Sequence, residues 1–290
     1  MKLILTGSSG FVGKQFMSAM NDQYQIKPVS LITTKIDDID FNKIDTIVHL
    51  AGMAHQMQEI DEKIYFEVNR DLTIALARKA KKNGVKHFIF ISTVKVYGDN
   101  NTMTSLNENS SCSPSDPYGQ SKFEAEEGLK QLETGTFKVA IIRPPLVYGK
   151  YVKGNLQRIM GLVEKLPVLP FDGINNARSM VYVGNLIKLI EVIMIKTASG
   201  VFIAGDREPH STTKLVSLIN ENLASNKILV QLPDFVVQLI RKVKPQLANR
   251  LFDSYIVDNS LTNTMLNYTP PFSFEQGITE MVQDFKSSKK

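Results

Sequence analysis

The sequence contains a single cysteine and no tryptophan. The lone Cys112 cannot form an intrachain disulfide, which is typical of proteins from a reducing compartment. No histidine lies near it in the chain, so we expect Cys112 to be a loop residue rather than a catalytic thiol.

Long apolar runs are also missing. No segment reaches the roughly 18 apolar residues that a membrane-spanning helix needs, and the apolar start is too short for a signal peptide. We therefore expect a cytoplasmic protein with no integral membrane segment. No group of His, Cys, Asp and Glu has metal-ligand spacing, so we predict no metal. The basic residues behind the net charge of +5 are scattered, which argues against a nucleic acid partner.

Short apolar runs of strand length alternate with amphipathic stretches of helix length. The apolar runs are residues 3–5, 46–50, 88–91 and 139–142, and the helical patterns are 11–20, 64–83 and 118–134. Continuous apolar strands are typical of a sheet covered on both faces, and strand–helix alternation indicates parallel strands. We predict an α/β fold with a Rossmann-type doubly wound parallel sheet in residues 1–150. A smaller C-terminal α/β region, residues 151–290, would bind substrate, while residues 178–205 would return to the first domain.

Residues 233–251 are apolar and basic at helical spacing. Such a helix can cover a small substrate-binding region or lie on a membrane surface. We expect the first of these.

A glycine motif follows the first predicted strand. Gly7 allows a tight turn, Gly10 lets the backbone approach a pyrophosphate, and Gly13 lets the next helix pack on the strand. The start of that helix would face the pyrophosphate with free N–H groups. The motif predicts a dinucleotide site. The other loop residues assigned to this site are Ser9, Phe11 and Val12.

The acidic residue that usually binds the adenosine ribose is absent from the end of the second predicted strand. Residues 29–35 contain no acid, and the first one along the chain is Asp37. Thr34 and Lys35 can instead receive a 2′-phosphate. This pattern favours NADP(H) over NAD(H).

Tyr118 and Lys122 lie one helical turn apart on a predicted helix. A nearby cation lowers the pKa of a phenol and eases proton transfer near neutral pH. The spacing alone is expected by chance about once in a chain with these numbers of tyrosine and basic residues. Thr93, however, follows the strand 88–91, where parallel sheets hold ligands, and its hydroxyl can bond to a substrate oxygen. Together with the glycine motif, these three residues predict a nicotinamide-dependent oxidoreductase.

The chain resembles the extended short-chain dehydrogenase/reductases, the NAD-dependent epimerase/dehydratase group. The resemblance rests on residues 49–52, 68–71, 92–98, 116–122, 142–149 and 178–185. Within the group the chain is most similar to bacterial enzymes of surface-polysaccharide synthesis that reduce a UDP-linked 4-keto-6-deoxy-N-acetylhexosamine. Those enzymes share a further histidine, here His55.

The resemblance implies roles for individual residues. Thr93 would bond to the sugar C4 oxygen, Tyr118 would transfer the proton, and Lys122 would hold the nicotinamide ribose and tune Tyr118. Further cofactor contacts would come from Asp38, Ile39, Leu50, Ala51, Gly52, Asn69 and Pro145. Substrate contacts would come from His55, Thr93, Asn155, Arg178 and Arg250, the last three at the nucleotide diphosphate. His49 and His87 lie in or beside strands and are expected to be structural.

The function predicted from these patterns is reduction of the C4 keto group of a UDP-linked 4-keto-6-deoxy-N-acetylhexosamine, with Tyr118 as proton donor. An NAD-dependent UDP-(N-acetyl)hexose 4-epimerase uses the same residues and is the alternative. A non-catalytic dinucleotide-sensing protein does not need Tyr118 and Lys122, whose presence argues against it. The resemblance also implies a homodimer that pairs through the helices near 62–83 and 117–134.

Overall fold

The structure, a computed structural model, describes residues 1–53, 61–98 and 105–289. Six parallel strands form its large sheet in the order β2-β1-β3-β4-β5-β9. These strands are β1 (Lys2–Thr6), β2 (Gln25–Val29), β3 (Thr46–His49), β4 (His87–Ile91), β5 (Lys138–Arg143) and β9 (Gly200–Ile203). Each of the four apolar runs in the sequence forms one of these strands. The predicted parallel, Rossmann-like sheet is therefore confirmed.

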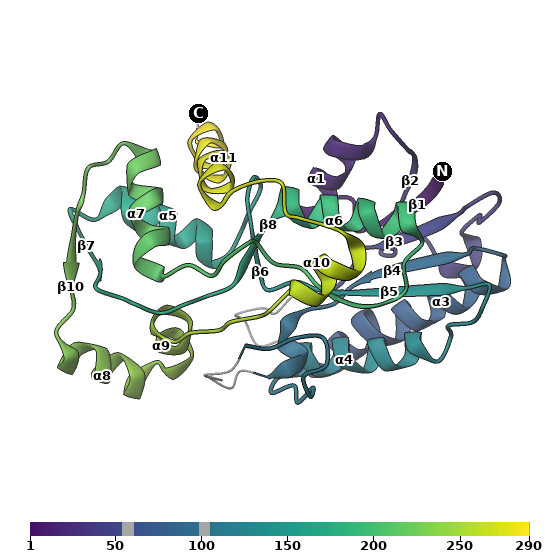
Figure 1. The fold of residues 1–290 in the computed structure, drawn as a ribbon, viewed down its shortest axis with the longest axis horizontal. Coiled ribbons are helices and arrows are strands. Elements are labelled where there is room, and N and C mark those ends of the chain that lie inside the picture. Colours follow the sequence, from purple (N-terminus) through teal and green to yellow (C-terminus); the bar gives the residue numbers. More distant parts are fainter. Residues whose placement is uncertain (54–60, 99–104, 290) are drawn as a thin grey trace.

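Helices cover both faces of the large sheet (Figure 1). One face carries α1 (Phe11–Met20) and α6 (Val183–Lys196), and the other carries α3 (Leu72–Lys82) and α4 (Pro117–Lys130). Alternate strand residues supply the two cores because successive side chains point to opposite faces. Leu3 and Leu5 pack in the same core as Phe16, whereas Ile4 packs in the core that contains Leu76.

The two long predicted helices differ from expectation in detail. The segment predicted as one helix over 64–83 consists of α2 (Glu62–Tyr65), the π-helical turn η2 (Phe66–Asp71) and α3. The helix predicted over 118–134 ends at Lys130. It ends early because Thr134 and Phe137 pair with each other through their backbones and turn the chain into β5.

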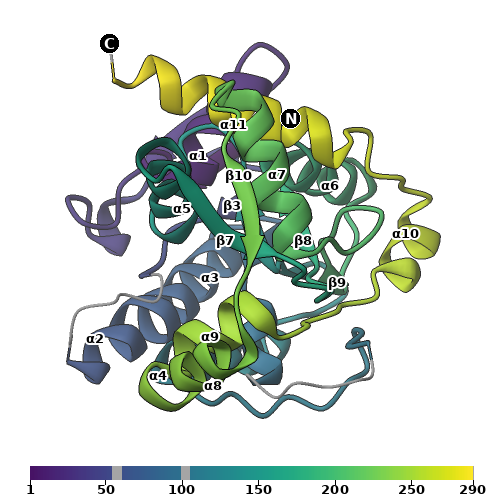
Figure 2. The same cartoon turned by 90° about the vertical axis from the view of Figure 1, so that its left-hand side faces the viewer.

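A smaller lobe lies beyond the carboxyl ends of the strands (Figures 1 and 2). It contains two short parallel pairs, β6 (Leu146–Tyr148) with β8 (Met180–Tyr182) and β7 (Val168–Asp172) with β10 (Ile228–Gln231). Helices α5 (Asn155–Lys165), α7 (Thr212–Leu223) and α11 (Phe274–Ser287) pack there, with α10 (Ser260–Leu266) nearer the large sheet. Ser211 and Ser273 cap α7 and α11 through their side chains.

The stretch 233–251 forms α8 (Asp234–Val243) and α9 (Pro245–Phe252). Helix α8 packs on α9, and none of its residues is fully buried. The expectation that this stretch covers the substrate-binding region stays a prediction. Only Ala248 is buried on α9. Among the described residues no helix is both long and apolar enough to cross a bilayer.

One ion pair between α4 and β5 is almost completely removed from water. Glu126 is 0% and Arg143 is 2% exposed. The Arg143 guanidinium donates to both carboxylate oxygens of Glu126, and its remaining nitrogen donates to the Tyr97 hydroxyl at 2.8 Å. The Glu126 carboxylate also accepts from the Ser92 hydroxyl. Every partner in this network is satisfied, so α4 is held at a defined position on the sheet.

Replacing Glu126 by Ala leaves the buried Arg143 cation without its partner. We expect the free energy of unfolding to fall by about 3–5 kcal/mol, measured by urea denaturation. Glu127→Ala is the matched control on the same helix, because Glu127 is exposed and pairs with Lys130 at 2.7 Å on the helix surface. That control should change stability by less than about 0.5 kcal/mol. Equal effects of the two substitutions would contradict this account.

Candidate active site

The glycine motif lies where β1 passes into α1. Gly7 has φ +74°, and a Cβ there would lie 2.6 Å from the backbone nitrogen of Ala51. A Cβ on Gly13 would lie 2.1 Å from the Gly7 carbonyl oxygen, so only glycine lets α1 approach the strand this closely. A Cβ on Gly10 would meet nothing nearer than 3.2 Å. The loop is therefore tightest at Gly7 and Gly13 and less crowded at Gly10.

The start of α1 suits an anionic ligand. Gly10 is its N-cap and supplies no side-chain cap, and the first turn holds no acidic residue. The first N–H groups of the helix are thus available together with its partial positive charge. Ser9, Phe11 and Val12 belong to the same turn. This geometry fits a dinucleotide diphosphate.

The loop after β3 lies beside the glycine motif. His49 is buried and bonded through its ring nitrogens to Thr6 at 2.7 Å and Thr73 at 2.9 Å. Burial, with a smaller effect from the Lys122 cation, lowers the pKa of His49 to about 3, so this ring is neutral and structural, as expected. The Thr6 hydroxyl also accepts from the Ala51 amide at 3.3 Å. Leu50, Ala51 and Gly52 are held at the sheet edge in this way.

The second strand of the chain ends before the segment that holds Thr34 and Lys35. β2 stops at Val29, so Ser30 occupies the position at the carboxyl end where an acid would bind the ribose. The Ser30 carbonyl accepts from the amide of Thr34 at 2.9 Å, which turns Thr34 back toward the strand end and leaves Lys35 exposed. Asp38 is exposed in the following turn, whereas Ile39 is buried in the core under α3.

Asn69 is fully buried within the π-helical turn η2. Its side-chain oxygen accepts from the Met53 amide at 2.8 Å, and its nitrogen donates to the Met53 carbonyl at 3.0 Å and to Ser121 at 3.1 Å. Asn69 thus joins the β3 loop to α4. A π-turn is a frequent device at functional sites because it redirects one side chain without ending the helix.

Thr93 and Tyr118 are brought together at the carboxyl end of β4. Thr93 follows β4 and caps the short helix η3 (Val94–Tyr97). Asp116 caps α4 by accepting from the Gly119 amide at 2.7 Å, which places Tyr118 in the first turn. The side chains of Thr93 and Tyr118 are hydrogen-bonded to each other. A hydroxyl and a phenol therefore converge where a substrate oxygen can lie.

Lys122 lies one turn further along α4 and is 5% exposed. Its ammonium donates to the Ile91 carbonyl at 2.9 Å and lies 4.4 Å from the centre of the Phe90 ring. A Cβ on Gly52 would come within 3.0 Å of the Lys122 nitrogen, so Gly52 leaves the room that the ammonium needs. This wall of the site is formed by α4, β4 and the β3 loop together.

Burial governs the protonation of both groups. Desolvation raises the pKa of the partly exposed Tyr118 to about 12, against a lowering contribution from the hydrogen bond with Thr93. Desolvation lowers the pKa of Lys122 to about 7, while the carboxylate of Glu126 opposes that change. Near neutral pH Lys122 is therefore balanced between its charged and neutral forms.

Sequence reasoning missed the residues that support this site. Glu126 continues the stripe of Tyr118 and Lys122 by another four positions on α4, and that spacing was the available signal. Arg143 gives no local signal, because its partner lies 17 residues away in the chain. Lys95 pairs with the capping residue Asp116, so it ties η3 to the start of α4.

Three of the predicted substrate residues, Asn155, Arg178 and Arg250, lie on the smaller lobe, whereas Thr93 lies beside Tyr118. Asn155 is the exposed first residue of α5. Arg178 donates from one guanidinium nitrogen to the carbonyls of Asn249 and Asp253, at 3.1 and 2.8 Å, and Arg250 follows on α9. Pro145 is buried just after β5. His55 lies outside the described residues.

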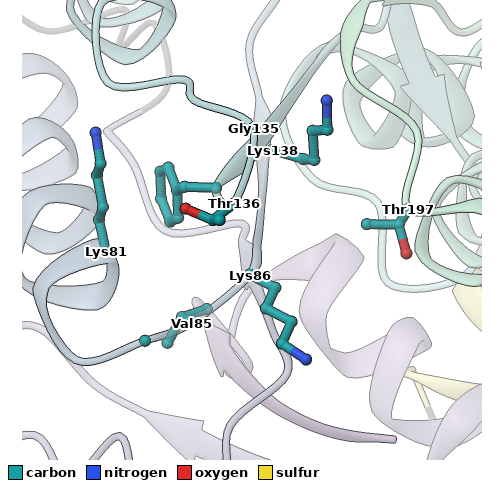
Figure 3. A pocket seen from close by; sticks show the side chains of 9 residues that line it. Lys81, Val85, Lys86, Gly135, Thr136, Lys138 and Thr197 are labelled. Atoms are coloured by element: carbon teal, nitrogen blue, oxygen red, sulfur yellow. The ribbon is translucent and has the colours of Figure 1, made fainter.

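A hollow of about 400 Å³ lies at the opposite edge of the large sheet (Figure 3). It is lined by residues before β4 and β5, among them Lys81, Lys86 and Lys138. In Figure 3 the side chains of Lys81 and Lys138 extend in one direction and that of Lys86 in another, so their ammonium groups do not meet at a shared centre. This hollow is at the amino ends of the strands and holds none of the predicted site residues.

Known proteins resemble this chain over nearly its whole length. The profile of the NAD dependent epimerase/dehydratase family matches residues 3–205. A UDP-glucose 4-epimerase of Vibrio cholerae is 32% identical, covering 98% of this chain and 95% of its own. An N-acetyl-alpha-D-glucosaminyl-diphospho-ditrans,octacis-undecaprenol 4-epimerase of Escherichia coli O157:H7 is 26% identical, covering 99% and 96%. The structure of UDP-glucuronic acid 4-epimerase from Bacillus cereus in complex with NAD has the same fold, with a TM-score of 0.79 at 20% identity and full coverage of both chains.

The lowered pKa of Lys122 predicts a dependence of stability on pH. Above about pH 7 the folded chain has lost this proton, whereas the unfolded chain keeps it until its ordinary pKa near 10. In that window the unfolded state binds more protons, so the free energy of unfolding rises with pH. Relative to Lys122→Met, the cofactor-free protein should gain about 2 kcal/mol between about pH 7 and 9.

Urea denaturation at a series of pH values measures this difference. Lys130→Met, at an exposed lysine of the same helix, supplies the baseline. If the difference in free energy of unfolding between the wild type and Lys122→Met stays constant over the whole pH range, Lys122 is not desolvated.

Proposed function

The chain belongs to the NAD-dependent epimerase/dehydratase family, and we propose that it inverts the configuration at C4 of a UDP-linked hexose or N-acetylhexosamine. The hydrogen bond between Thr93 and Tyr118, with Lys122 one turn further on α4, carries the proposal. Support comes from the epimerases that match over nearly the full length of both chains. A nicotinamide dinucleotide is the cofactor that fits the tight glycine loop and the start of α1, which has no side-chain cap.

In this proposal Tyr118 accepts and returns the proton of the C4 hydroxyl. A phenol with a pKa near 12 is a poor base, but a charged ammonium one turn away favours the phenolate. Tyr118 then accepts the proton of the C4 hydroxyl while Thr93 hydrogen-bonds to the same oxygen. The bound nicotinamide supplies the hydride acceptor and donor. Tyr118 returns the proton when the C4 hydroxyl is re-formed on the opposite face.

Binding of the nucleotide falls to the smaller lobe in this proposal. Asn155 at the start of α5 offers an amide, and Arg178 and Arg250 offer guanidinium groups to the diphosphate. Arg178 is held in place by backbone carbonyls of α9 and of the residue after it. The hydrogen bonds of Arg178 thereby link the sugar-nucleotide site to α9.

The second candidate is reduction of the C4 keto group of a UDP-linked 4-keto-6-deoxy-N-acetylhexosamine. One observation favours it: Ser30 stands at the end of β2 where NAD enzymes usually carry an acid, and the exposed Lys35 follows. This arrangement accommodates the 2′-phosphate of NADPH. Tyr118 would then only donate its proton, to the oxygen formed from the keto group.

Two incubations separate these candidates. The first supplies UDP-glucose or UDP-N-acetylglucosamine without added cofactor, and NMR follows the appearance of the 4-epimer, which we expect. The second supplies the UDP-linked 4-keto-6-deoxy sugar with NADPH or NADH, and absorbance at 340 nm follows the nucleotide. Stoichiometric oxidation there, with no conversion in the first incubation, would establish the reductase instead.

Tyr118→Phe removes the proton-transfer group and keeps the ring. We expect turnover to fall by at least about 100-fold, with the Kd for cofactor, measured by calorimetry, changed by less than about threefold. Tyr24→Phe is the control, because the Tyr24 hydroxyl contacts Glu191 away from this site. Undiminished turnover in Tyr118→Phe would exclude the proposed mechanism.

Ser30→Asp places a carboxylate at the end of β2. We expect the preference for NAD(H) over NADP(H) to rise by about tenfold or more, because the carboxylate can bind ribose hydroxyls and repels a 2′-phosphate. Calorimetric Kd values for both cofactors test this. Lys35→Gln should weaken NADP(H) alone. If neither substitution changes the ratio, the cofactor is not held at this strand end.

A further inference from the structure

An apolar stripe on α8 faces outward rather than toward the protein. Phe235, Leu239 and Val243 follow one another at four-residue intervals and are 73%, 58% and 65% exposed. Leu247 on α9 and Ile228 on β10 are 45% and 68% exposed. We call these five residues the α8 face. Single exposed apolar residues are ordinary, but a row of large ones on one helix marks an interaction surface.

Basic residues border the α8 face. Residues 227–252 contain five basic residues and one acidic residue. Lys242 precedes Val243 in the last turn of α8, Lys244 follows it, and both are exposed. Arg241 is exposed as well and pairs with Asp253 at 2.8 Å. The exposed charge around the stripe is therefore positive.

This combination points to one kind of partner. A second copy of the chain would bring the same basic border against itself, and like charges at an interface oppose association. An anionic lipid surface offers an apolar interior for Phe235 and Leu239 and negative headgroups for Lys242 and Lys244. The place of α8 also suits a flat partner, because the helix forms a corner of the molecule at the end far from α3 (Figures 1 and 2).

We infer that the α8 face docks on the surface of an anionic membrane, with α8 lying in the plane of the headgroups. Docking does not depend on the proposed reaction. It would, however, affect the substrate side of the molecule, since Arg178 is hydrogen-bonded to the carbonyls of Asn249 and Asp253 at the end of α9. A sugar diphosphate presented at a bilayer would then meet the smaller lobe first.

The absence of tryptophan makes a direct test available. Leu239→Trp introduces the only tryptophan of the chain, and its emission is recorded with vesicles of phosphatidylcholine alone or mixed equally with phosphatidylglycerol. We expect a shift to shorter wavelength, and quenching by brominated lipid, only with the mixed vesicles. Ile195→Trp is the control, since Ile195 is 62% exposed on α6 in the other lobe. Its emission should not change.

Vesicle co-sedimentation of variants tests the two components of the face. Phe235→Ser/Leu239→Ser should weaken binding by about tenfold or more through lost apolar contact. Lys242→Gln/Lys244→Gln should weaken it by a similar factor, as should raising the ionic strength to about 1 M. Lys82→Gln/Lys86→Gln, at exposed lysines of the large-sheet lobe, should bind like wild type.

Three outcomes would overturn the inference. The first is that the wild type fails to bind anionic vesicles, and the second is that Phe235→Ser/Leu239→Ser binds them as well as the wild type does. The third outcome is that the wild type binds no vesicles but self-associates in ultracentrifugation, and that this variant abolishes the self-association. The last outcome would make the face an interface between copies. Turnover of a water-soluble UDP-sugar without vesicles is measured in parallel. It should be the same in the docking variants, so failure of docking and failure of the proposed function are separable.

Discussion

Glu126 and Arg143 are charged residues that are buried together between α4 and β5, and the geometry of the site depends on them. Such a pair is tolerated in the interior only where each partner is fully hydrogen-bonded. Ser92 and Tyr97 complete the network from the end of β4 and from η3. The position of α4 relative to these strand ends is thereby set. Because Tyr118 and Lys122 lie two turns and one turn before Glu126, the ion pair also aligns them with Thr93.

Burial orders the site and also changes the pKa of Lys122. Lys122 keeps a buried ammonium beside the Ile91 carbonyl and the Phe90 ring, and desolvation brings its pKa to about 7. Glu126 opposes this loss of charge. Lys122, one helical turn from Tyr118, therefore changes between its charged and neutral forms near neutral pH, where the enzyme would work. Asn69 and Gly52 contribute differently, by fixing the loop that leaves room for the lysine.

The two lobes carry different parts of the proposed site. The large sheet brings the glycine loop, the β3 loop and the proposed catalytic residues to one edge, as parallel strands with covering helices generally do. The smaller lobe carries the residues proposed for the nucleotide diphosphate and, on its outer side, the α8 face. Arg178 links these two parts through its hydrogen bonds to the end of α9. The proposed membrane contact on α8 and α9 is therefore connected through Arg178 to the side of the lobe proposed to bind substrate.

The family and the sheet were determined by local patterns in the sequence. Apolar runs alternating with helical stretches predict buried parallel strands, and the glycine motif defines its turn because only glycine fits at Gly7 and Gly13. Tyr118 and Lys122 share a helix face by spacing alone. Thr93 could be placed beside them because parallel strands end at a common edge.

Other features were decided only by the tertiary structure. The partnership of Glu126 with Arg143 and the hydrogen bonds of Asn69 with Met53 and Ser121 each depend on contacts between distant segments. The α8 face is the clearest case. Periodicity shows that α8 is amphipathic, but it cannot show whether the apolar side meets protein or solvent. That outcome depends on which surfaces remain uncovered after the rest of the chain has packed.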